Sequence, residues 1–404
     1  MTTLHTEQQD SPLEKQQGAQ HGAKAHTDGD WANRAPVQTR SDRFKSTDIA
    51  AFPALTGREV NWKYTPVAEL TQLTGGDLAD SNSALEISAA EGVEVTSIPM
   101  DSELVGRAGL PEDQAAANAW GQVESAQRIL LTSHDHQTVT VKRTALTDAP
   151  SAAHTIIEAA PQSDTVVILE NTGAANLTET VEIVVGAGAN LKVVSIQEWD
   201  ADAIHLATHN ATVGRDGNLQ HIVVSLGGKI VRLNPSIHLD GQGANGEAYG
   251  AYFADAGQHL EHQVYVDHNA PNTRSRVAYK GALQGEGARA VWIGDVLIRR
   301  VASGTDSYEE NRNLTLTEGT RADSIPNLEI ETGDIEGAGH ASTTGRFDEE
   351  HIFYLQSRGI SEDEARKLVV RGFLIDVIQR IGNQQIEERL QTAIESELEQ
   401  SVLA

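Results

Sequence analysis

The feature that most limits the possible folds lies between residues 151 and 345. This region is a long series of short strand-like segments, and no segment of helical period interrupts them. Within it, Asn176, Asn190 and Asn218 each follow a small residue and precede Leu, and they lie 14 and then 28 residues apart. Asn245 follows 27 residues after Asn218. A turn and strand that recur at a multiple of about 14 residues are typical of a solenoid. If one coil spans about 28 residues, Asn190 and Asn218 should stack on adjacent coils.

A β-sandwich also contains many short strands, so it is the alternative fold for this region. Several segments, however, carry unbroken apolar runs, such as VVIL at 166–169 and IVV at 183–185. These runs suit strands that are buried on both faces better than a meander with one wet face. We therefore predict a mainly β protein with a parallel β-helix over residues 151–345.

The residues before this region divide into two parts. Residues 1–45 are rich in Gln, Ala, His, Gly and Thr and contain few large apolar side chains, so we predict a disordered tail. Residues 46–150 contain a helix-like segment at 111–124, with Pro near its start, and the strand-like segments ILLTS and QTVTVKRTAL. This part is predicted to be an N-terminal mixed α/β domain.

Residues 346–404 change to a helical period and are predicted to form a C-terminal helical domain. Ser361 and Glu364 form an S-x-x-E capping box at the start of one helix. A later helix carries a single apolar stripe of Ile and Leu at every fourth position, namely Ile386, Leu390, Ile394 and Leu398. Such a stripe needs an apolar partner surface, either elsewhere in this chain or on another protein.

Charge and cysteine content exclude several classes of function. The chain has 31 Lys and Arg against 58 Asp and Glu, a formal net charge of −27, so a nucleic-acid partner is not expected. It has no cysteine, which excludes disulfides, thiolate catalysis and cysteine-based metal sites within this chain. It shows neither a secretory signal at its start nor an apolar run long enough to span a membrane, and we expect a cytoplasmic protein.

Motifs for common enzyme chemistry are absent. Gly227-Gly228-Lys229 lacks the rest of a phosphate-binding loop, and no dinucleotide-binding or nucleophile-elbow motif is present. His205 and His209 have the spacing of a zinc helix, but they lack its Glu and lie among strands. His134 and His136 match a cupin-type pair only weakly.

The densest histidine cluster comprises His259, His262 and His268. Imidazole binds first-row metals well, so these three residues are candidate iron ligands, although polar residues that line turns or one sheet face are the more common case. His340 is a lone histidine in a Gly-rich stretch at the end of the predicted solenoid. The exposed edge there must be capped or paired, which favours a partner-facing role for this residue.

Several long segments, in order along the chain, resemble the SufB/SufD family of iron–sulfur cluster assembly scaffolds. They are Arg43–Phe44, Gly57–Glu59, Val266–Pro271, Tyr279–Gly281, Ser307–Leu314, Asp323–Ile330, Asp334–Gly345 and Phe353–Ile360. The similarity covers about residues 40 to 400. Within the family, the chain is most similar to SufD-type members, because the cysteines that SufB-type chains use in sulfur and cluster chemistry are missing.

The resemblance implies a right-handed parallel β-helix between an N-terminal domain and a C-terminal helical domain. It further implies a non-catalytic scaffold in a SufBCD complex, which pairs with a SufB-like subunit where the cluster forms and docks a SufC-like ATPase through its C-terminal helices. Leu368 and Phe373 are the candidate partner-binding residues on those helices. The resemblance also allows a homodimer of this chain without SufB.

Carried over by position, His340 matches the family histidine at the SufB–SufD interface, a candidate ligand of iron or of the nascent cluster. Neutral imidazole can complete an iron site whose thiolates come from the partner. Many relatives have Cys and Gly where this chain has Ala338 and Ala341, so no cysteine ligand can come from this subunit. We therefore expect no cofactor bound by the chain alone, only transient iron or an iron–sulfur cluster at the SufB interface, and we find no flavin motif.

Two other classes of function compete with this scaffold role. One is a β-helix enzyme acting on polysaccharide, which the strong negative charge disfavours for uronate substrates. The other is a stand-alone iron-binding protein that uses His259, His262 and His268.

Overall fold

The computed structural model describes residues 43–88, 90–143, 146–346 and 349–400. The disordered tail was predicted for residues 1–45. Of these, residues 1–42 lie outside the described residues. At its end, Phe44 packs edge-on against Phe52 with ring centroids 5.1 Å apart, and Lys45 pairs with Glu112 at 3.1 Å. Phe44 is also where the compact unit described below begins.

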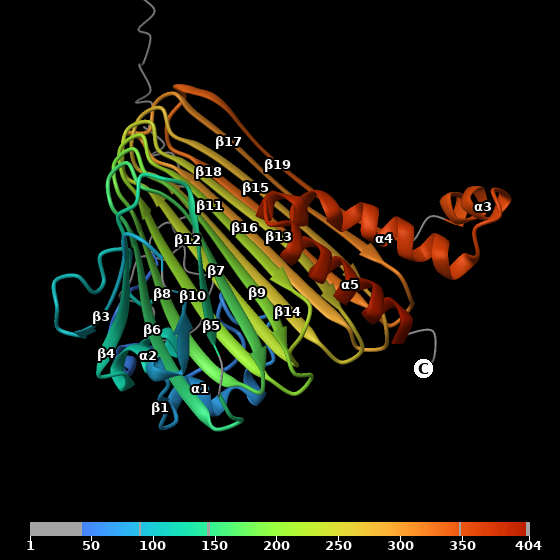
Figure 1. Ribbon diagram of the computed structural model, residues 1–404, viewed down its shortest axis with the longest axis horizontal. Coiled ribbons are helices and arrows are strands. Elements are labelled where there is room, and N and C mark those ends of the chain that lie inside the picture. The colour runs from blue at the N-terminus through green and yellow to red at the C-terminus, as the bar shows by residue number, and fades with distance from the viewer. Residues whose placement is uncertain (1–42, 89, 144–145, 347–348, 401–404) are drawn as a thin grey trace, which may run out of the picture. The chain divides into compact units, whose positions relative to one another are not determined.

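Two sheets form the walls of a parallel β-solenoid and take alternate strands from the chain (Figure 1). The first sheet contains β3 (Val93–Pro99), β4 (Ser125–Leu131), β6 (Pro150–Ala159), β8 (Asn176–Val185), β10 (Ile204–Val213), β12 (Ile230–Leu239), β14 (His259–His268), β16 (Arg289–Ile298) and β18 (Arg321–Ile330), and β1 (Ala79–Asp80) pairs with β6. The second sheet contains β2 (Leu85–Ile87), β5 (Gln137–Arg143), β7 (Asp164–Gly173), β9 (Asn190–Trp199), β11 (Asn218–Ser225), β13 (Asn245–Ala254), β15 (Arg274–Leu283), β17 (Thr305–Thr315) and β19 (Ile335–Arg346).

The solenoid strands pair in parallel, and antiparallel strands close one end. β3 pairs antiparallel with β4, and β2 pairs antiparallel with β5. The next strands, β6 and β7, continue in parallel from β4 and β5. The first parallel strands therefore lie within residues 46–150, the range predicted for the N-terminal domain. The predicted parallel β-helix is confirmed, and the β-sandwich alternative is excluded.

The asparagine repeat marks the coils as predicted. Asn218 pairs in register with Asn190 on the second sheet, and Asn245 pairs with Asn218. The Asn218 side chain also donates a 3.0 Å hydrogen bond to the Asn190 side chain, 28 residues earlier. Asn176 lies on the first sheet, where it pairs with Ile204. One coil thus spans about 28 residues, and the spacing of 14 separates the two walls of one coil.

Both faces of each sheet are buried over much of the solenoid. Val167 and Leu169 point into the solenoid core, whereas Val166 and Ile168 on the same strand pack under the C-terminal helices. On the other wall, Trp62 and neighbouring apolar residues of the N-terminal region cover the outer face. This two-sided burial explains why the strands carry unbroken apolar runs.

Helices flank the two walls. The α-helices are α1 (Thr71–Gly75), α2 (Gln114–Gln122), α3 (Glu349–Ser357), α4 (Glu362–Ile378) and α5 (Gln384–Gln400), and the 3-10 helices are η3 (Ile49–Ala51), η4 (Val67–Glu69), η5 (Asn82–Ala84) and η6 (Gln379–Ile381). Helix α2 begins within the predicted range, with Asp113 accepting a 2.9 Å hydrogen bond from the backbone N–H of Ala116. Ser361 caps α4 by accepting from the backbone N–H of Glu364, as the capping box predicts.

Helices α4 and α5 lie across the outer face of the second sheet (Figure 1). The predicted apolar stripe of α5, from Ile386 to Leu398, is buried against this sheet and α4, so its partner surface lies within the chain. Lys192 on β9 donates to the backbone carbonyls of Arg380 (2.7 Å) and Ile381 (3.2 Å), which satisfies the end of the helical segment. No helix in the described ranges is both long and apolar enough to cross a membrane.

Candidate functional site

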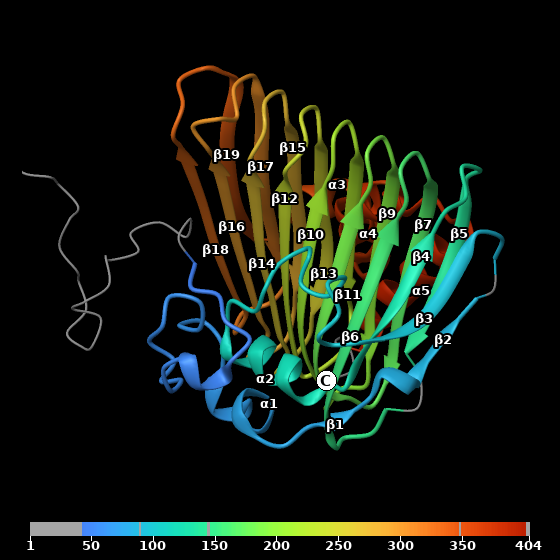
Figure 2. The same cartoon turned by 90° about the vertical axis from the view of Figure 1, so that its left-hand side faces the viewer.

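His340 lies on β19, the last strand of the second sheet, at the end of the solenoid away from β5 (Figure 2). Its side chain is 45% exposed. In the register between β17 and β19, its direct partner is Glu309. Paired residues of neighbouring parallel strands point their side chains to the same side of the sheet, about 4.8 Å apart. His340 and Glu309 therefore share one face.

That face is the interior of the solenoid. Asn311, two residues after Glu309, is fully buried and donates to the Tyr252 hydroxyl at 2.9 Å. Glu309 itself is fully buried, and its carboxyl group reaches the opposite wall beside Trp292 and Gly294. A Cβ atom on Gly294 would overlap both the Trp292 ring and the Glu309 carboxyl group, so glycine makes room for them.

The Glu309 carboxyl group is poorly satisfied. The backbone of Asn327 approaches it, but neither of its oxygens makes a hydrogen bond of normal geometry within the described part of the chain. Burial, aided by the nearby Asp295 carboxylate and only partly opposed by the backbone of Asn327, raises the pKa of Glu309 to about 8. Among the described residues, the nearest basic side-chain atom is Nδ1 of His340, 3.9 Å from Oε1, which is too long for a hydrogen bond.

The last coil has no thiol beside this pair. Ala338 lies two residues before His340, pairs with Ser307 and packs against the solenoid core, so it shares the inward face. Farther along the same strand, Ser342 donates a 2.8 Å hydrogen bond to Ser324 on β18, which joins the two walls at this end. A thiolate beside His340 would therefore have to come from another protein, because the chain has no cysteine.

The histidines singled out by spacing are held in separate contacts. His259 bonds Glu261 at 2.8 Å, His262 bonds the Ser225 hydroxyl at 3.0 Å, and His268 bonds Thr273 at 2.8 Å. No group of three or more His, Cys, Asp or Glu side chains in the described ranges is placed to hold a metal ion. The three residues lie along one strand, β14, and are spread too far apart to converge on one ion.

His205 and His209 lie inside the solenoid and belong to a buried polar network. His205 bonds Glu179 at 3.0 Å, and Arg143 also donates to Glu179. Burial would raise the pKa of Glu179, but Arg143 and His205 outweigh it and hold this pKa below its ordinary range. His209 contacts His221 at 2.9 Å. The zinc-like spacing of His205 and His209 thus reflects two inward positions on a strand.

His134 and His136 lie on an exposed turn beside residues of the next coil. His134 contacts the Gln162 carbonyl at 3.0 Å, and His136 contacts the Asp164 carboxyl group at 2.7 Å. Each histidine thus has a polar partner in the solenoid turns.

The motifs in the sequence do not single out Glu309. Its strand reads TDSYEENRN over residues 305–313, so polar residues occupy both of its faces and no alternation distinguishes them. The structure makes the distinction: Ser307, Glu309, Asn311 and Asn313 are buried inside the solenoid. Sequence alone does not show which face of this strand points inward.

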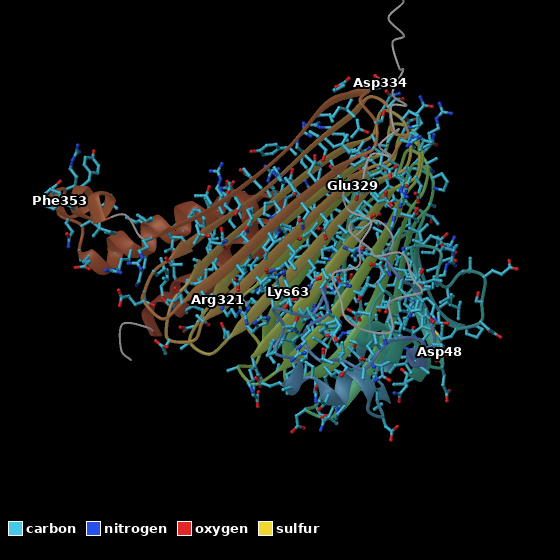
Figure 3. All side chains as sticks on the ribbon, turned by 180° about the vertical axis from the view of Figure 1, so that it is seen from behind. Asp48, Lys63, Arg321, Glu329, Asp334 and Phe353 are labelled. Carbon is cyan, nitrogen blue, oxygen red and sulfur yellow. The ribbon has the colours of Figure 1, made fainter. Side chains whose placement is uncertain are left out.

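The two residues predicted to bind a partner differ in accessibility. Leu368 on α4 is 41% exposed, whereas Phe373 is half-buried, packs against the helix–sheet core and lies under Lys280 at 5.4 Å. Helix α3 packs on α4 and exposes Phe353 and Tyr354, and Figure 3 shows Phe353 at the outer side of this helix. Helix α3 and the first half of α4 therefore expose apolar side chains.

Comparison with known proteins places these residues in a family context. The family described as "SUF system FeS cluster assembly, SufBD core domain" matches residues 141–373, a span that includes Glu309, His340 and most of α4. An iron–sulfur cluster assembly SufBD family protein of Mycobacterium leprae is 43% identical over 366 residues, which cover 88% of this chain and 93% of the relative. A SufBD family protein of Mycobacterium tuberculosis is 43% identical over 374 residues, covering 90% of this chain and 94% of the relative.

A second SufBD family protein of Mycobacterium leprae is more distant. It is 32% identical over 222 residues, which cover 55% of this chain but 25% of that relative. The same organism therefore has two such proteins, and this chain resembles one of them over nearly the whole length of both sequences.

Proposed function

Because the chain belongs to the SufBD family of iron–sulfur cluster assembly proteins, we propose that it is the SufD-type scaffold subunit of an assembly complex. It pairs with a SufB-type chain through the end of the solenoid that carries β18 and β19. Helices α3 and α4 dock a SufC-type ATPase. The chain itself is not catalytic.

One observation carries this proposal: an exposed histidine, His340, lies on the last coil of a family member that contains no cysteine. Imidazole binds iron but cannot accept or carry sulfur, so the sulfur chemistry requires a second chain. Among the described strands, β18 and β19 are the edges of their sheets at this end, which suits pairing with such a chain. The pattern of similarity to two SufBD proteins in one organism supports a division of labour between paralogues.

The test is to co-express this chain with SufB-type and SufC-type subunits and purify the complex without oxygen. Its mass and its iron and sulfide content are then measured for wild type and His340→Ala. We expect an intact hetero-complex in both, with cluster content clearly reduced in His340→Ala. His136→Ala, which removes an exposed histidine from a distant turn, is the matched control. Failure of the wild-type chain to form the complex would contradict the proposed function, and unchanged cluster content would contradict the role of His340.

A further inference from the structure

The geometry points to a two-donor seat for ferrous iron at the last coil, in which the Glu309 carboxyl group is a second ligand beside His340. This inference rests on the proposed function in one respect, namely that iron is the substrate brought to this end of the solenoid. The ligand is Fe²⁺ itself, held by one carboxylate oxygen and one imidazole nitrogen of this chain.

The two donors are close enough to bind one ion. Glu309 and His340 are register partners on β17 and β19, and Oε1 lies 3.9 Å from Nδ1. Two donors that bind one ion at about 2.1 Å each cannot be more than about 4.2 Å apart. The observed separation lies within that limit, although it is too long for a hydrogen bond.

The Glu309 carboxyl group lacks the partners that a structural residue would have. It is fully buried, and although the backbone of Asn327 is near, neither oxygen makes a hydrogen bond of normal geometry within the described ranges. Buried carboxyl groups elsewhere in this solenoid are well satisfied, as Glu261 is by Thr65, Arg232 and His259. An unpaired buried carboxyl group is costly to keep and calls for an explanation such as an ion.

The charge and shape of the surroundings also suit a bound ion. Asp295 adds negative potential at Glu309, and among the described residues His340 is the only basic side chain within 4.0 Å of its carboxyl oxygens. Such surroundings favour a cation. Gly294 on the opposite wall leaves the space that the carboxyl group occupies.

Carboxylate and imidazole are the donors of many non-haem ferrous sites, so the donor chemistry fits Fe²⁺. Two protein donors leave most of the coordination positions to water or to groups of a partner chain. This agrees with the finding that no cluster of three metal-binding side chains exists among the described residues. The seat would therefore hold iron weakly in the isolated chain and more tightly once a partner supplies thiolates.

The experiment is an anaerobic titration of the full-length chain with ferrous ammonium sulfate, followed by calorimetry. The variants are Glu309→Gln and His340→Ala, and Glu310→Gln is the matched control. Glu310 is the next residue on the same strand, with the opposite orientation, and it pairs with Arg312 at the surface. We expect Glu309→Gln and His340→Ala each to weaken Fe²⁺ binding by at least about tenfold, and Glu310→Gln to leave it unchanged. Iron K-edge absorption should also show altered coordination in Glu309→Gln.

The two-donor iron site is wrong if Glu309→Gln binds Fe²⁺ with wild-type affinity. It is also wrong if the wild-type chain binds no Fe²⁺. Thermal melting checks that each variant is folded, and Glu309→Asp, which retracts the carboxyl group by one methylene, serves if the amide does not fold. Glu309→Asp should also weaken Fe²⁺ binding, and wild-type affinity in that variant would equally overturn the seat. Co-purification with SufB-type and SufC-type subunits is scored separately. A complex that forms normally while Glu309→Gln binds iron like wild type would reject the seat and leave the proposed function standing.

Discussion

Arg232 on the first wall of the solenoid donates a 2.7 Å hydrogen bond to Asp113, the residue that caps helix α2. Both side chains are buried, and the Arg232 guanidinium also stacks over the Trp62 ring at 3.9 Å. A single buried arginine thus connects the solenoid to two separate segments of the N-terminal region. The N-terminal residues are therefore part of the solenoid's packing, and they cover its outer wall.

This relationship predicts a large effect for Asp113→Ala. The variant removes the cap of α2, which costs about 1 kcal/mol, and leaves a buried arginine short of a carboxylate, which costs roughly 3 kcal/mol more. The free energy of unfolding, measured by urea denaturation, should fall accordingly. Asp48→Ala, which removes a comparable cap from the short helix η3 at an exposed position, is the control and should cost far less. Equal effects of the two variants would show that the Arg232 contact adds nothing.

Glycines inside the solenoid make room for aromatic rings. A Cβ atom on Gly281 would overlap the ring of Tyr252, which passes over this glycine so that its hydroxyl group can bond Asn313 on the same wall. Gly281→Ala should therefore lower the free energy of unfolding by about 1–3 kcal/mol. Gly372, in the middle of α4, has open space around it, so Gly372→Ala should instead raise stability by about 0.5–1 kcal/mol. Thermal or urea unfolding of both variants measures the difference, and the same sign for both would contradict it.

The sequence contained enough information to predict the architecture because the coil repeats its turn chemistry. Asn190 and Asn218 occupy the same turn position on successive coils, so their spacing gave the register directly. A fixed period would nevertheless fail farther along the chain. Register partners lie 26 residues apart between Pro150 and Asn176, but 32 apart where Arg321 follows Arg289, because later coils have longer turns. The parallel pairing already begins at β4 and β5, within the range predicted for the N-terminal domain. The sequence does not show this, because short strands next to a helical segment do not reveal which strands they pair with.

The site was predictable only in part. His340 could be assigned from a resemblance and from its place near the end of the repeat. Its neighbour Glu309 lies 31 positions away in the sequence, and no local pattern connects the two residues. Their proximity follows from the length of one particular coil, which is a property of the fold.

Buried neutral histidines make the stability of the solenoid depend on pH. Burial lowers the pKa of His209 to about 4, with Glu179 opposing and His205 and Arg143 adding to the shift, and burial also lowers that of His221. The unfolded chain therefore takes up protons on these rings first. Stability from these groups is present above about pH 6.5 and is lost as the pH falls toward 4, by about 1.4 kcal/mol per pH unit and per histidine.

Unfolding free energies between pH 7 and pH 5 measure this slope. In His209→Gln, the slope of the unfolding free energy against pH should be shallower by the contribution of one histidine. This holds whatever the change in absolute stability. An identical slope in wild type and variant would show that His209 does not titrate on unfolding.

The exposed apolar side chain of Leu368 provides a cleaner test of the docking surface than Phe373 does. Phe373 is half-buried against the second sheet, so Phe373→Asp would disturb the packing of α4 as well as any interface. Leu368→Asp changes a side chain that is 41% exposed and should leave the melting temperature nearly unchanged. If α4 docks a SufC-type ATPase, this variant should reduce co-purification of that subunit while the SufB-type chain is retained, because a charge in an apolar contact must be desolvated without a partner.

Val301→Asp, at an exposed valine following β16, is the matched control and should not affect either subunit. Equal recovery of the ATPase with Leu368→Asp and wild type would place the docking surface elsewhere.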